Sequence, residues 1–65
     1  MDKRGTEELA AILVHQYGRW ALTHARQRRS QHAHEPYSEA FRMWNAITAA
    51  TARLLRSRAR RLRAG

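Results

Sequence analysis

The sequence contains no cysteine, one proline, three glycines and a single lysine among its 65 residues. The absence of cysteine excludes disulfide bonds and any zinc site built on thiolates. A chain this short buries only about 60% of its unfolded surface, so its stability depends on close helix packing or on a partner subunit. We expect one domain, residues 1–65, and the composition is compatible with a cytoplasmic protein.

Long apolar segments are also missing from the sequence. The longest uninterrupted apolar run is Leu9–Val14, far below the roughly 20 residues that a membrane-spanning helix requires. The first six residues are mostly polar and are not followed by the apolar core of a secretory signal peptide. We therefore expect no transmembrane segment and no signal peptide.

Acidic residues are absent after Glu39. The 13 basic residues outnumber the 5 acidic ones, which gives a formal net charge of +8, and six arginines lie in residues 53–65. A GC-rich coding sequence would explain why arginine outnumbers lysine, but it would not explain why the charge gathers at one end. Because such a segment is costly to bury, we expect it to face water or an anionic partner.

Pro36 separates two segments that both have helical periodicity. Thr6 is a suitable N-cap for the first helix, and the second begins either with Pro36 at its first position or with Ser38 as N-cap. The predicted fold class is all-α, an antiparallel two-helix hairpin. The predicted bounds are about 6–29 for the first helix, 30–35 for the loop and about 36–62 for the second helix, with its arginine-rich end.

Each predicted helix carries an apolar stripe, and Ile12 falls outside it. Two helices cannot enclose both stripes, and an exposed aromatic face normally marks an interface. The simplest closure is a homodimer that forms a four-helix bundle, and a heteromeric partner is the alternative. The residues expected in the core or at this interface are Leu13, Tyr17, Trp20, His24, Phe41, Trp44 and Ile47.

Gly18 lies in the middle of the first predicted helix. A glycine in a helix interior costs about 1 kcal/mol relative to alanine, so it requires a reason. Together with Ala11, Ala21 and Ala25, it lies toward one edge of the apolar stripe, which predicts a close approach of the two helices. The alternatives are a simple kink or a glycine tolerated by chance.

Three short stretches carry a resemblance to known proteins, namely Leu13-Val14, Gly18-Arg19-Trp20-Ala21 and Trp44-Asn45-Ala46-Ile47. In these stretches the sequence resembles short, uncharacterised bacterial two-helix proteins. The resemblance covers roughly residues 9–55 and leaves out the arginine-rich end. It implies the helical hairpin and no activity, so no role of any residue follows from it.

No group of residues has the pattern of a catalytic or metal site. His32, His34 and Glu35 are the densest set of possible ligands, but they precede a proline in a loop without fixed geometry, and we interpret them as solvated. The sequence has no glycine-rich phosphate loop, no paired carboxylates and no serine with a plausible base. We expect no enzymatic activity, no cofactor and no bound metal.

The arginines near the end of the sequence divide between two faces of the second helix. Arg58 and Arg61 turn toward its apolar side, where we expect them to meet the acidic start of the first helix, at Asp2, Glu7 or Glu8. The row that remains free for nucleic-acid phosphates or an acidic protein partner comprises Arg53, Arg56, Arg60 and Arg63.

Two functions follow as hypotheses. The first is a non-enzymatic regulatory or accessory protein whose basic C-terminal helix binds nucleic acid without sequence specificity. The sequence contains no recognised DNA-reading motif, and a helix-turn-helix would need a third helix. The alternative is a protein-interaction module, such as a small subunit, adaptor or inhibitor, that uses its aromatic apolar face.

Overall fold

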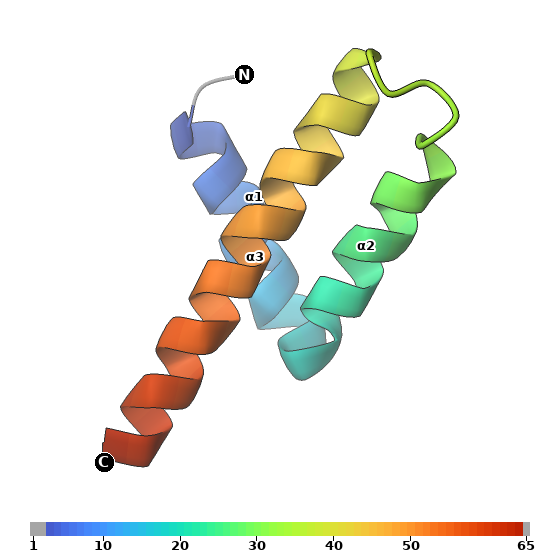
Figure 1. The fold of residues 1–65 in the computed structure, drawn as a ribbon. Coiled ribbons are helices and arrows are strands. Elements are labelled where there is room, and N and C mark those ends of the chain that lie inside the picture. The colour runs from blue at the N-terminus through green and yellow to red at the C-terminus, as the bar shows by residue number, and fades with distance from the viewer. Residues whose placement is uncertain (1–2, 65) are drawn as a thin grey trace.

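The computed structural model describes residues 3–64, and all of them are helical except the loop at residues 32–38. The all-α fold class is confirmed, since no strand occurs in this part of the chain. The elements, in order, are helix α1 (Lys3–Tyr17), the 3-10 helix η1 (Gly18–Trp20), helix α2 (Ala21–Gln31) and helix α3 (Glu39–Ala64) (Figure 1).

The chain reverses direction at two places, η1 and the loop at residues 32–38 (Figure 1). Helices α2 and α3 form the predicted antiparallel hairpin, and α1 packs along another side of α3. Helix α1 runs in the same general direction as α3, because Thr6 lies beside the start of α3 and Gly18 lies beside Leu54. Helix α3 is therefore the central element, and both α1 and α2 pack against it.

The prediction of one continuous first helix over residues 6–29 is wrong, because the chain turns at Gly18. The backbone dihedral φ of Gly18 is 56°, a left-handed value that glycine adopts readily and other L-residues avoid. A tight 3-10 turn follows, and α2 leaves it in a new direction. Tyr17 and His24 show the effect, since their rings stack with centroids 4.4 Å apart, whereas seven residues of straight helix span about 10 Å.

Gly18 is required by its backbone conformation and not by close helix packing. A Cβ atom added at Gly18 would meet no other heavy atom within 4 Å. The predicted role of this glycine in close helix approach is therefore wrong, and the kink that we considered as an alternative is confirmed.

The helix starts also differ in part from the prediction. Helix α1 begins at Lys3, so Thr6 lies within it and is not its N-cap. Helix α3 begins at Glu39, and the Ser38 hydroxyl accepts a hydrogen bond of 3.1 Å from the backbone N–H of Phe41. Ser38 is therefore the N-cap, while Pro36 lies in the loop. Glu39 places a carboxylate in the first turn, where the helix dipole stabilises negative charge.

The core is small and receives residues from three helices. Leu13 of α1, Ala21 and Ala25 of α2 and Ile47 of α3 form its centre. Val14, Met43 and Trp44 are partly buried and pack against this centre. Because α1 turns back at Gly18, it covers a side of α3 that a two-helix hairpin would leave exposed.

Two buried threonines extend the core along α3 without leaving polar atoms unpaired. The Thr48 hydroxyl donates a hydrogen bond of 2.6 Å to the Trp44 carbonyl, and the Thr51 hydroxyl donates one of 2.7 Å to the Ile47 carbonyl. No buried side-chain nitrogen or oxygen lacks a partner among the described residues. These bonds within the helix make the two hydroxyls compatible with burial.

The expected core residues divide into three groups. Leu13 and Ile47 are buried, and Trp44 packs against the core. His24 and Phe41 are partly buried. Tyr17 and Trp20 are exposed at 41% and 60%, so a single chain does not bury them in its core, and their place at an interface stays a prediction. The bend at Gly18 removes these two rings from the apolar stripe that a continuous helix would have.

Replacement of Gly18 tests whether backbone conformation dictates this residue. We expect Gly18→Ala to lower the free energy of unfolding by about 1–2 kcal/mol, the cost of an L-residue in the left-handed region. Gly18→Asn should cost less, because asparagine tolerates this region better than alanine. Urea denaturation followed by circular dichroism measures both. If the larger asparagine costs more than alanine, then available space and not φ determines the residue.

Candidate nucleic-acid interface

The C-terminal half of α3 projects beyond the rest of the fold (Figure 1). Helix α3 has 26 residues, which corresponds to about 39 Å of helix, and the principal dimensions of the molecule are 42 × 22 × 16 Å. All side chains from Arg58 to Arg63 are exposed. Alanine, leucine and arginine are good helix formers, so this segment continues as a helix with few tertiary contacts.

Arg53 forms the ion pair that we expected for Arg58 or Arg61. Its guanidinium nitrogen Nη2 lies 2.8 Å from Oε1 of Glu7, and the two side chains are 52% and 45% exposed. The prediction that Arg53 is free is therefore wrong, and so is the pairing of Arg58 or Arg61 with Glu7. Asp2, one of the other two expected partners, lies outside the described residues.

The direction of α1 explains this exchange of partners. In an antiparallel pair, the acidic start of α1 would lie beside the last turns of α3. In the structure α1 crosses α3 at an angle while running in the same general direction (Figure 1), so the Glu7 side chain reaches Arg53 and the end of α1 at Gly18 lies beside Leu54 and Arg58.

Arg58 and Arg61 instead line a groove between the end of α1 and α3. This groove has a volume of about 430 Å³, and it is lined by Ala11, Val14, His15, Gly18, Leu54, Arg58 and Arg61. No carboxylate lines it. Among the residues that the structure describes, neither Arg58 nor Arg61 makes a side-chain hydrogen bond or ion pair. The positive charge of this groove is therefore not compensated within the described chain.

Three of the four arginines predicted to be free lie together on the outer face of α3. Arg56, Arg60 and Arg63 line a shallow hollow with Ala59. At 3.6 residues per turn, this row lies roughly 160° around the helix from Arg58 and Arg61. The projecting half of α3 thus carries arginines on two nearly opposite sides.

The turn at η1 adds Arg19, to which the sequence analysis gave no role. The Cζ atom of Arg19 lies 5.0 Å from the ring centroid of Trp20, which is the geometry of a cation–π contact. Arg19 also lines a hollow with Leu55, Arg58, Ala59 and Leu62. A continuous helix would have kept Arg19 on its polar face, so only recognition of the left-handed glycine could have revealed this contact with α3.

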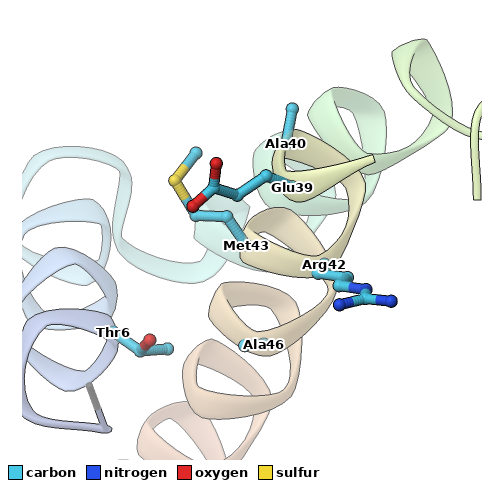
Figure 2. Close-up of a pocket in the computed structure, with 6 residues that line it drawn as sticks. All are labelled: Thr6, Glu39, Ala40, Arg42, Met43 and Ala46. Carbon is cyan, nitrogen blue, oxygen red and sulfur yellow. The ribbon is translucent and has the colours of Figure 1, made fainter. Parts of the chain in front are cut away.

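Another hollow, of about 570 Å³, lies at the opposite end of α3. It is lined by Thr6, Glu39, Ala40, Arg42, Met43 and Ala46. Figure 2 shows Glu39 and Met43 on the side that faces α1, while Arg42 points away from it. One carboxylate with no histidine or second acid beside it does not form the nucleophile–base or acid–base pair that catalysis requires.

The histidine-containing loop has no converging geometry. The Nε2 atom of His34 lies 3.6 Å from Oε1 of Glu35, and both side chains are about 70% exposed, at 71% and 68%. No group of three histidine, aspartate or glutamate residues within residues 3–64 is arranged to hold a metal ion.

No family model matches the chain, and neither do the curated proteins or solved structures with which it was compared. The resemblance to short bacterial two-helix proteins therefore stays a prediction. Of the helices described here, none is both long and apolar enough to cross a lipid bilayer.

The Arg53–Glu7 pair can be tested by Glu7→Gln, with Glu35→Gln as a control that removes the same charge at a distant exposed site. We expect Glu7→Gln to change the unfolding free energy by less than about 1 kcal/mol, because the pair is exposed. It should raise the salt concentration needed to elute the protein from immobilised heparin more than Glu35→Gln does, because it frees Arg53. Equal elution of the two variants would show that the pair does not restrict Arg53.

Proposed function

We propose that this protein is a small non-enzymatic regulatory or accessory chain that binds nucleic acid through the C-terminal half of α3. The observation that carries the proposal is the projecting basic helix with arginines on two sides. Residues 40–65 include seven arginines and no acidic residue. A helix with this charge distribution attracts a phosphate backbone from solution.

The contacts that the geometry supports are with phosphates and not with base edges. Arginine forms bidentate contacts with phosphate oxygens, which carry no sequence information. The outer row of Arg56, Arg60 and Arg63 offers three such contacts without disturbing the core, because Ala59 between them is also exposed. Binding is therefore expected to be independent of sequence and sensitive to salt.

Salt-dependent titration of labelled oligonucleotides tests this proposal. We expect dissociation constants of about 1–100 µM near physiological salt. The triple variant Arg56→Ala/Arg60→Ala/Arg63→Ala should bind more weakly, and the slope of log K against log salt should fall by about 2–3. Fluorescence anisotropy at several salt concentrations measures both quantities.

The matched control for that experiment is Arg26→Ala/Arg28→Ala/Arg42→Ala. It removes the same charge from exposed positions outside the projecting segment. If the control loses as much affinity as the triple variant, net charge and not the α3 surface governs binding. Absence of binding at low salt would remove the proposal.

A second candidate, a protein-interaction module, is favoured by the exposed surface area. The accessible surface is 5086 Å², whereas a compact monomer of 7.6 kDa exposes about 4,300 Å². The excess of roughly 800 Å² equals the share of one partner in a standard interface. Leu9 and Ile12 of α1 are exposed at 39% and 51%. Under this candidate a partner chain covers them, either another protein or a second copy in the homodimer for which we predicted a four-helix bundle.

Sedimentation equilibrium at micromolar concentration tests the homodimer. If α1 forms the interface, the wild-type chain should sediment with twice the mass of the chain, and Ile12→Lys should shift it to the monomer because the buried ammonium would lack a partner. Thr23→Lys adds the same charge at an exposed position on α2 and should leave the dimer intact. A wild-type monomer at high concentration would eliminate the homodimer and leave another protein as the partner under this candidate.

A further inference from the structure

Trp20 has an unusual environment for a tryptophan. Its side chain is 60% exposed, although tryptophan is on average among the most buried residues. It lies in η1, so the bend at Gly18 presents it at the surface in contact with Arg19, which lines a hollow together with Arg58. Trp20 is not among the side chains that form the core or pack against it.

The ring of Trp20 lies against one cation. The guanidinium of Arg19 lies 5.0 Å from the ring centroid of Trp20, and Arg19 and Arg58 line the same hollow on α3. A neutral apolar partner docked on Trp20 would have to bury the charge of Arg19 without compensation, which is costly. The surroundings of the ring therefore favour an anionic ligand that also has a flat apolar surface.

Arg58 connects this hollow with the groove at the end of α1. It lines both hollows, and Arg61 and His15 line the groove with it. Guanidinium groups without partners at this place suit phosphate oxygens. An aromatic ring and several phosphate-binding cations thus lie within one continuous surface around η1.

We propose that this surface binds a single-stranded segment of nucleic acid, with one base stacked on Trp20 and neighbouring phosphates held by Arg19, Arg58 and Arg61. The inference rests on the proposed function and adds to it the class of nucleic acid and the site. Bases in a duplex are stacked on one another, whereas unpaired bases can stack on an exposed aromatic ring. The outer row of Arg56, Arg60 and Arg63 contacts either form through phosphates alone.

The experiment uses three labelled ligands of about 12 nucleotides: oligothymidylate, a strand with the same number of phosphates but abasic residues, and a duplex of equal length. The wild-type chain should bind oligothymidylate more tightly than the abasic strand. Trp20→Ala should weaken oligothymidylate binding by about 5- to 150-fold and change duplex and abasic binding by less than about twofold. Trp20→Phe should restore most of the affinity.

Two matched controls accompany these variants. Tyr37→Ala removes a ring that is exposed at 87% in the loop at residues 32–38, and it should leave all three affinities unchanged. Arg58→Ala/Arg61→Ala should weaken oligothymidylate binding more than Arg28→Ala/Arg42→Ala, which removes the same charge near that loop. Thermal melts by circular dichroism identify any variant that has lost its fold.

The possible results separate the inference from the proposed function. If no ligand binds, both fall. If all three ligands bind and Trp20→Ala weakens them equally or not at all, the single-strand site is overturned while phosphate binding by α3 stands. A dimer in sedimentation that Trp20→Ala converts to a monomer would also overturn the inference, because a second copy would then cover the ring.

Discussion

The left-handed backbone of Gly18, with φ at 56°, is the constraint on which the rest of the structure depends. It ends α1, allows the 3-10 turn and sends α2 back along the molecule. Without it, the sequence has the periodicity of one long helix that would meet α3 along a single face. With it, α1 and α2 pack against α3 separately, and a chain of 65 residues encloses a small core shared by three helices. The position has open space for a side chain, so conformation alone restricts it.

The same turn determines which arginines of α3 lie beside a carboxylate. Because α1 runs alongside α3 in the same direction, its carboxylate at Glu7 reaches Arg53 in the middle of α3. The end of α1, where His15 adds a further basic side chain, shares a groove with Leu54, Arg58 and Arg61 of α3. Positive charge on the projecting segment is therefore uncompensated on two sides. A prediction based on antiparallel pairing exchanged the roles of Arg53 and of Arg58 and Arg61, because it assumed the opposite direction for α1.

Local patterns predicted much of the structure correctly. Helical periodicity predicted the all-α class, the burial of Leu13 and Ile47 and the exposure of Ile12. Capping rules and the single proline predicted the division near Pro36 and offered Ser38 as N-cap. Several other expectations failed because of one residue, Gly18. Helix propensity disfavours glycine by only about 1 kcal/mol, a cost that tertiary contacts can override, so the sequence could not distinguish a tolerated glycine from a left-handed turn. The exposed rings of Tyr17 and Trp20 and the new place of Arg19 all follow from that turn.

The sequence alone determined the composition of the surface: a basic segment after Glu39, arginine as its cation, and a helix without the residues that would end it. These properties are local, because charge and helix propensity belong to each residue and its near neighbours. Only the tertiary structure decided which arginines are paired, which line a groove and which aromatic rings reach the surface. Those outcomes depend on the direction in which α1 and α2 pack against α3, and a single backbone dihedral at Gly18 changes that direction for every residue before it.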